Sequence, residues 1–272
     1  MSHLAYDDHG AGTPVVLLHG LTFDRTTWRP VIERLGDGLR AVAIDLPGHG
    51  ETGGEPCRLD EVAERVHALL GELEIERPVV VGHSVSGAIA GIYAGTYTAL
   101  GVVNVDQPLD VRPFAQLVRR LEPALRGPGF AEAFEPIQAS MEIWRVPEPE
   151  RSHLLTIQDI RAELVLGYWA ELLESDPDEL QARIEATTAG ASRAGIAYLG
   201  VFGRELASAD RAYLRAHISA LQLEEWPEHG HLPHLVEPDR FAARVRRFVD
   251  ECGPAQAPAS GRRVMTTLPM TS

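Results

Sequence analysis

The chain of 272 residues is long enough for one large domain or for a core with an inserted subdomain. With 44% hydrophobic and 24% charged residues it has the composition of a globular protein, and its formal net charge of −14 disfavours nucleic acid and anionic membranes as partners. Its two cysteines, Cys57 and Cys252, are too few and too far apart for a disulfide framework or a thiolate metal site.

In chain order, the first ten residues, MSHLAYDDHG, lack the apolar stretch of a signal peptide. No later stretch approaches the roughly 18 uninterrupted apolar residues of a membrane span, so we expect a cytoplasmic location. Short apolar runs alternate with helical patterns, which predicts an α/β fold with a mostly parallel sheet and helices on both faces. The predicted strands lie in 14–20, 39–50, 78–84, 100–106, 195–203 and 220–226, and the predicted helices in 59–75, 87–97 and 238–251.

The character of the chain changes between residues 108 and 193. Strand-like runs vanish there, and amphipathic helical patterns separated by Pro and Gly replace them. We interpret 108–193 as a helical cap inserted into an α/β core that is formed by 1–107 and 194–252. The last stretch, 253–272, is rich in Pro, Ala, Ser and Thr without periodicity, and we predict that it is disordered.

The stretch GHSVS at 82–86 lies between a predicted strand and a predicted helix, and it departs from the G-x-S-x-G elbow only in its last residue. Such an elbow exposes a nucleophilic serine at the end of a sheet, and its flanking residues must be small. Ser86 is small enough, so we interpret Ser84 as a nucleophile; the alternative is a chance G-x-S after a strand. The backbone N–H of Val85, with another from the loop at 19–21, would form an oxyanion hole.

A general base must come from histidine, and three candidates, His229, His231 and His234, lie near the C-terminus. His231 follows Gly230 directly after the last predicted strand, at the sheet edge where open α/β folds bind ligands. We therefore assign the base to His231. The spacing of the three histidines also suggests a metal site, but a first-row metal would usually need further ligands, and a leucine and a proline separate two of them. We expect no metal.

Taken in order, these motifs resemble those of the α/β-hydrolase superfamily. The matching stretches are HG at 19–20, DLPGHG at 45–50, GHS at 82–84, GH at 230–231 and EP at 237–238. The resemblance implies that Ser84 is the nucleophile, that His231 is the base, and that the N–H groups of Leu21 and Val85 form the oxyanion hole. It also implies a structural role for Asp45 in its loop.

The triad acid departs from the usual superfamily pattern, in which it follows the strand after the cap in a form like G-x-x-D. Counting from Gly203, that position is Leu206, and leucine cannot orient an imidazole. Asp106, at the end of the strand after the elbow helix, resembles the acid of fungal zearalenone lactonases and certain haloalkane dehalogenases. We favour Asp106 as the acid. The alternatives are a turn or helix-cap role for Asp106, with Glu205 or Asp210 as the acid.

The leading hypothesis is a serine hydrolase that cleaves an ester or lactone bond of a small, largely apolar molecule through an acyl-enzyme, without a cofactor. One alternative keeps the fold and changes the reaction to carbon–carbon bond hydrolysis or perhydrolysis. Another is a small-molecule receptor, because GHSVS also resembles the subgroup of plant strigolactone and karrikin receptors and a bacterial stress-signalling relative. Candidate pocket residues are Trp28, Trp144 and Trp169. We expect no nucleic-acid or membrane partner.

Overall fold

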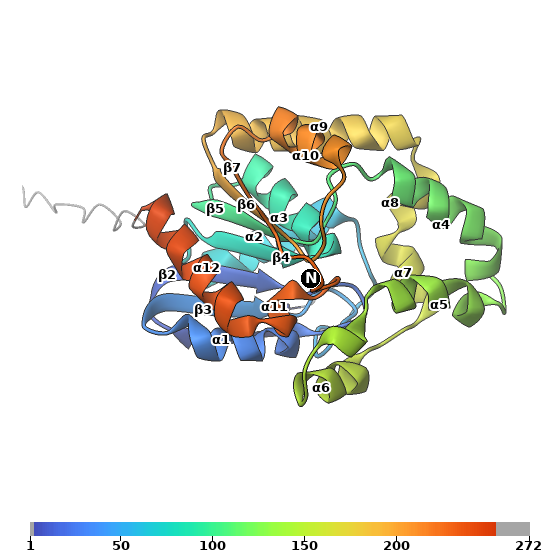
Figure 1. The fold of residues 1–272 in the computed structure, drawn as a ribbon, viewed down its shortest axis with the longest axis horizontal. Helices are drawn as coiled ribbons and strands as arrows, with labels where there is room; N and C mark the ends of the chain where they lie inside the picture. The colour runs from blue at the N-terminus through green and yellow to red at the C-terminus, as the bar shows by residue number, and fades with distance from the viewer. Residues whose placement is uncertain (1–2, 254–272) are drawn as a thin grey trace, which may run out of the picture.

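The computed structural model describes residues 3–253, so the predicted disordered tail from residue 254 onward lies outside the described residues. Within them, seven strands form one sheet in the order β1-β3-β2-β4-β5-β6-β7 (Figure 1). β1 pairs antiparallel with β3, and all other neighbouring strands are parallel. The strands are β1 (Tyr6–Gly10), β2 (Gly12–Leu18), β3 (Gly38–Ile44), β4 (Val79–His83), β5 (Gly101–Val105), β6 (Ala197–Phe202) and β7 (Leu221–Glu225).

Alternate residues of the central strands supply two apolar clusters, one on each face of the sheet. Val15 of β2 belongs to the cluster that includes α1 and α12, and Val16 belongs to the cluster that includes α2 and α3. Strands covered on both faces read as continuous apolar runs, so the predicted α/β class is confirmed. The flanking helices are α1 (Arg29–Leu35), α2 (Leu59–Glu72), α3 (Val85–Thr96), α10 (Ser208–His217), α11 (Pro233–Val236) and α12 (Pro238–Cys252), and a 3-10 turn, η1 (Arg25–Trp28), precedes α1.

β1 is an element that the sequence patterns did not predict. Its residues, YDDHG, are half-buried or exposed, and they lie at the edge of the sheet against β3. An exposed edge strand needs neither an apolar run nor a strict alternation, so its sequence carries little strand signal.

Between β5 and β6, the described chain forms helices and no strand. The segment predicted as a cap, 108–193, contains α4 to α9. Figure 1 shows α4 to α8, hereafter named the cap helices after that prediction, gathered to the right of the sheet, whereas α9 runs beside α3 and α10. Buried cap side chains such as Phe134 and Trp169 belong to the same apolar cluster as α2 and α3. The elements are α4 (Arg112–Leu125), α5 (Phe130–Ser140), η2 (Ile143–Arg145), α6 (Glu150–Ile157), α7 (Ala162–Tyr168), α8 (Ala170–Glu174) and α9 (Pro177–Arg193).

Among residues 3–253, no helix combines the length and the apolar character that crossing a bilayer requires.

Candidate active site

Ser84 lies in the tight turn between β4 and α3, with φ 55° and ψ −130°. A positive φ is rare for a residue with a side chain and is typical of strained turns at functional sites. The N–H of Ser84 donates to the carbonyl of Val105 at 2.9 Å, and the N–H of Gly87 donates to the carbonyl of Ser84 at 2.7 Å. Ser86 is buried, and its Oγ donates to the carbonyl of His19 at 2.5 Å. The serine that replaces the usual glycine therefore fastens the elbow to the loop after β2.

The loop after β2 passes directly beside Ser84. A Cβ on Gly20 would lie 3.4 Å from the Ser84 Cβ and 2.6 Å from His83 Nδ1, so only glycine fits there. The next backbone N–H belongs to Leu21. Neither this N–H nor that of Val85 has a backbone hydrogen-bond partner among residues 3–253. Both donors are thus available to a substrate oxygen beside Ser84.

Two buried histidines, His19 and His49, support this loop. The Nε2 of His19 accepts from the N–H of Leu46 at 3.0 Å, and the Nε2 of His49 accepts from the N–H of Thr22 at 3.3 Å. Because each Nε2 accepts, the proton of each ring lies on Nδ1. Burial lowers the pKa of His19, and it lowers the pKa of His49 to about 2. Both rings are therefore neutral supports of the backbone.

Asp45 is fully buried, and its carboxylate is occupied by its own loop. It accepts from the N–H of Arg25 at 2.7 Å and from the N–H of Glu51 at 2.8 Å, and it also pairs with the Arg25 guanidinium. These contacts hold the turn after β3 in place, which is the structural role that the family resemblance implies.

Asp106 and His231 form a direct pair. The Oδ2 of Asp106 lies 2.7 Å from the Nδ1 of His231; the carboxylate is fully buried and the imidazole is 20% exposed. The N–H of Gly203 donates to the other carboxylate oxygen at 3.2 Å, and the Nη1 of Arg204 lies 3.5 Å from Oδ2. A carboxylate only accepts, so His231 donates through Nδ1 and keeps Nε2 for a second partner.

The other candidate acids lie elsewhere. Glu205 is 78% exposed and pairs with an arginine of α10 at 3.2 Å. Asp210 is exposed in the first turn of α10, and Leu206 is buried in an apolar cluster. Of these candidates, Asp106 is the one that contacts His231.

Ser84 and His231 are connected through His83. Within the described residues, no hydrogen bond joins Ser84 Oγ to His231 Nε2. The Nε2 of His83 donates to the backbone carbonyl of His231 at 2.8 Å, and the two ring centres are 4.8 Å apart. Burial, and then the charges of His234 and His231, hold the pKa of His83 well below its usual value. A neutral His83 thus connects the loop of His231 to the elbow. The absence of a direct bond from Ser84 to His231 in the described part of the chain agrees with the general observation that contacts between nucleophile and base are often long without substrate.

The three C-terminal histidines do not converge on a common point. His229 Nε2 lies 3.1 Å from a Glu237 carboxylate oxygen, whereas the His234 ring packs on Trp28 with their centres 4.6 Å apart. Burial, followed by the charge of His231, lowers the pKa of His234 to about 3. In the part of the chain that the structure describes, no group of three or more His, Cys, Asp or Glu side chains is placed to hold a metal ion.

The three tryptophans expected in a pocket occupy three different environments. Trp28 is fully buried in the cluster of α1 and α12, so it is a core residue rather than a pocket residue. Trp169 is nearly buried, and its ring centre lies 5.9 Å from that of Phe134 inside the cap helices. Trp144 is 63% exposed, with the Arg145 guanidinium 4.4 Å from its ring centre.

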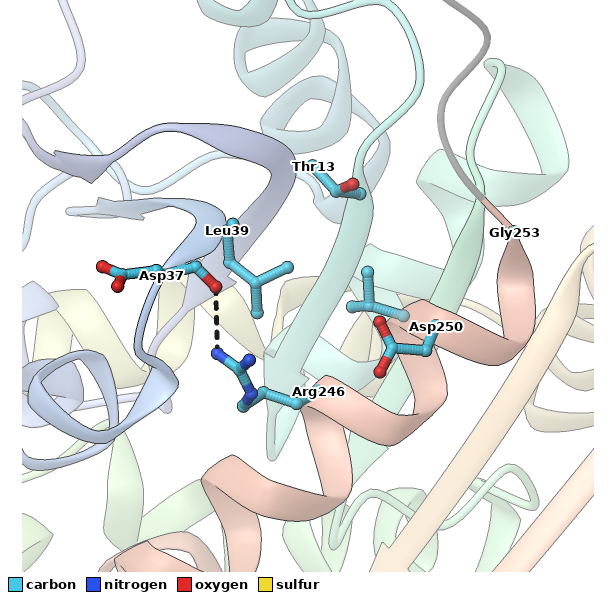
Figure 2. A pocket seen from close by; sticks show the side chains of 8 residues that line it. Thr13, Asp37, Leu39, Arg246, Asp250 and Gly253 are labelled. Carbon is cyan, nitrogen blue, oxygen red and sulfur yellow. Dashed lines mark hydrogen bonds between the residues drawn. The ribbon is translucent and has the colours of Figure 1, made fainter.

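Two surface hollows lie away from Ser84, Asp106 and His231. One, of about 230 Å³, lies at the amino ends of β2 and β3 beside α12, where Thr13, Leu39 and Arg246 line it (Figure 2). The other, of about 830 Å³, lies between residues 147–150 and 236–240. Ser84 lies at the carboxyl end of its strand, and none of the triad candidates lines either hollow.

Sequence reasoning missed His83 and Gly203, which contact the His231 loop, and the buried Asn104, whose amide bonds to Gln107. A Cβ on Gly203 would lie 1.7 Å from the carbonyl oxygen of Gly230, and the Gly203 carbonyl accepts from the N–H groups of His229 and Gly230 at 3.0 Å each. The available signals were a histidine inside the elbow motif, a lone amide in a valine-rich strand and a glycine directly after a strand.

Solved structures of similar fold include an esterase from Thermogutta terrifontis. It is 25% identical, with a TM-score of 0.71 over 92% of this chain and 93% of that chain. A hydrolase from Pseudomonas aeruginosa PA01 is 20% identical, with a TM-score of 0.74 over 90% of this chain and 94% of that chain, and shows the fold alone.

Relatives in sequence include a 2-succinyl-6-hydroxy-2,4-cyclohexadiene-1-carboxylate synthase from Serratia proteamaculans. It is 26% identical over 243 residues, which cover 86% of this chain and 92% of that protein. A shorter stretch of 86 residues is 43% identical to the dihydrolipoyllysine-residue acetyltransferase component of an acetoin cleaving system from Pseudomonas putida. That stretch covers 31% of this chain and only 23% of the longer protein. The alpha/beta hydrolase family model matches residues 15–244, and with the fold and the site described above the chain belongs to that family.

Proposed function

We propose that this protein is a serine hydrolase that cleaves an ester or lactone bond of a small, largely apolar molecule through an acyl-enzyme. The observation that carries the proposal is the 2.7 Å pair of Asp106 and His231, which His83 ties to a serine in a strained turn. A serine and a buried carboxylate at the ends of the adjacent strands β4 and β5, with an imidazole that contacts the carboxylate, are the parts that nucleophilic acyl transfer requires.

In the proposed reaction, Ser84 Oγ attacks the substrate carbonyl while its proton passes to His231 Nε2. The negative charge that develops on the carbonyl oxygen is stabilised by the N–H groups of Leu21 and Val85. Asp106 keeps the Nδ1 proton of His231 in place and stabilises the imidazolium. The imidazolium then gives its proton to the leaving alkoxide. A water molecule, deprotonated by the same ring, attacks the acyl group and frees Ser84.

A largely apolar substrate is supported by the apolar cluster to which the loop beside Ser84 belongs. One continuous apolar cluster includes Val80 of β4, Leu21 and Phe23 of the neighbouring loop, and Ile143 and Leu164 of the intervening helical segment. An apolar acyl or alkoxy group gains free energy when it leaves water for such surroundings. The esterase from Thermogutta terrifontis, similar over most of this chain, supports ester chemistry.

The proposal is tested with a fluorophosphonate probe and a panel of p-nitrophenyl esters and lactones of increasing chain length. We expect one labelled site, at Ser84, and loss of both labelling and hydrolysis in Ser84→Ala. Ser86→Ala is the matched control, because Ser86 is buried and bonded to His19, and this variant should still be labelled.

Hydrolysis that persists in Ser84→Ala, or labelling at another residue, would contradict the assignment of the nucleophile. An active probe site with no turnover of any ester or lactone would contradict the substrate class and leave Ser84 as the reactive group.

A further inference from the structure

Asn104 is the one polar side chain of β5, and it is fully buried. A buried amide must find hydrogen-bond partners, because leaving its donors and acceptor unpaired is costly. The Oδ1 of Asn104 accepts from the N–H of Gln107 at 3.0 Å, and Nδ2 donates to the carbonyl of Gln107 at 2.8 Å. Nδ2 also donates to the hydroxyl of Tyr198 at 3.0 Å.

The two bonds to Gln107 close the chain around Asp106. We call this pair of bonds the Asn104 bracket. Asp106 lies inside it with φ 55°, a left-handed backbone conformation that is uncommon for residues with a side chain and that aspartate tolerates better than most. The bracket holds both the N–H and the carbonyl of Gln107, so it fixes the peptide units on both sides of Gln107, and the first of these directly follows Asp106.

The helix α3 and the neighbouring strands β4 and β6 pack around Asn104. A Cβ on Gly87, in the first turn of α3, would lie 2.6 Å from Asn104 Oδ1, so the helix that begins at the elbow packs directly on the amide. In the sheet, Asn104 is paired with Gly82 of β4 on one side and with Gly200 of β6 on the other. The bracket around Asp106 therefore packs against the helix that begins at the turn of Ser84.

We propose that Asn104 is a positioning residue, whose bracket sets the Asp106 carboxylate against Nδ1 of His231. This inference rests on the proposed function. Two other contacts of Asp106, its N–H to the carbonyl of Val201 at 2.9 Å and its Oδ1 to Gly203, hold it against β6. Neither of them fixes the backbone after Asp106, which is where a relaxed turn would swing the carboxylate away.

The test replaces Asn104 by leucine, which has a similar shape and suits a strand of valines. We expect kcat to fall by about 10- to 100-fold, since small displacements of a catalytic group have such effects, while KM changes by less than about 2-fold. Tyr198→Phe is the matched control: it removes the third bond of the amide, leaves the bracket intact and should keep kcat within about 2-fold.

A double-mutant cycle separates positioning from general stability. In an Asp106→Asn background, Asn104→Leu should lower kcat by less than about a further 2-fold, because the carboxylate that it positions is already absent. Losses that multiply, or an equal loss of kcat in Tyr198→Phe, would overturn the inference. Full activity of Asp106→Asn alone would instead overturn the acid assignment in the proposed function.

Proton NMR gives a readout that does not depend on turnover. The Nδ1 proton of His231, bonded to Asp106, should give a downfield resonance that is lost or shifted in Asn104→Leu and retained in Tyr198→Phe. Asn104→Ala removes the same bonds without adding bulk, and it serves for both experiments where the leucine variant does not fold. An unchanged resonance in a folded Asn104 variant would overturn the inference.

Discussion

The ends of β5 and β6 lie side by side in the sheet, and both reach the loop that carries His231. β5 contributes a side chain, the Asp106 carboxylate, which contacts the imidazole. β6 contributes backbone: the N–H of Gly203 donates to Asp106, and its carbonyl accepts from His229 and Gly230. With the acid on β5, the loop after β6 supports the pair through its backbone, and Leu206 is free to join the apolar core.

The two strand ends are also held by different kinds of interaction. The turn after β5 is closed by the neutral amide of Asn104. The loop after β6 is held by Glu225, whose carboxylate accepts from the N–H of Leu206 at 2.8 Å and from the Arg211 guanidinium. The Asn104 amide therefore carries no group that titrates, whereas the contacts of Glu225 depend on a charged pair.

Among changes at the ends of β5 and β6, we expect the largest loss of kcat from Asp106→Asn. Loss of the carboxylate removes the group that orients and charges the imidazole, so kcat should fall by about 10³- to 10⁴-fold with the fold intact. Steady-state kinetics on an ester and a circular dichroism spectrum check this.

Adding Leu206→Asp to Asp106→Asn should not restore activity, because the Leu206 side chain lies in the apolar cluster and not against His231. Recovery of turnover in the double variant would show that the two strand ends are interchangeable as sources of the acid.

Gly203→Ala should have the next largest effect. The added Cβ would meet the Gly230 carbonyl, so the His231 loop must move, and kcat should fall by about 100-fold for a shift near 1 Å. A crystal structure of the variant measures the shift, and normal turnover would show that the backbone of β6 does not support the pair. Gly71→Ala in α2, where an added Cβ would meet no described atom within 4 Å, is the steric control.

Glu225→Gln should lower stability in a pH-dependent way. The hydrogen bonds from Arg211, and then from Leu206, hold the pKa of Glu225 below its usual range. The resulting stabilisation is complete above the unfolded-state pKa of about 4.3 and is lost as the pH falls through the lowered folded-state value. At pH 7 the wild type should melt about 2–4 °C above the variant. The two melting curves should converge in acid, and a gap that persists there would contradict an ionic contribution.

The smallest effect is expected from Glu205→Gln and Asp210→Asn. Both carboxylates are exposed and neither contacts His231, so kcat should stay within about 2-fold of wild type. Turnover lost in either variant, with Asp106→Asn active, would move the acid to the loop after β6.

Much of the fold could be predicted from the sequence because its signals are local. A run of valines directly before Ser84 is enough to predict a buried strand, and the leucine three residues after Gly203 is enough to exclude a carboxylate at that position. The Asn104 bracket spans only three residues, but it could not be predicted because it requires the chain to turn at Asp106 with a positive φ, and no short motif here indicates that turn. The structure places Trp28 in the core and not in the predicted pocket, because apolar character predicts burial but does not distinguish a core from a pocket.

The chain order of Ser84 and Asp106 has a consequence for how this molecule can vary. Both residues belong to the single β4–α3–β5 unit, which is complete before the first cap helix begins. Nucleophile and acid thus lie on elements close in sequence, and Asp106 is held in addition by Val201 and Gly203 at the end of β6. The length of the chain between β5 and β6 adds little entropic cost to the pairing of β4 with β5. Of the three residues, only His231 follows the inserted segment in the chain, so it is brought to the site by contacts between distant parts of the sequence. Chimeras that exchange the segment between β5 and β6 would therefore change what reaches Ser84 while the nucleophile and its acid keep their register.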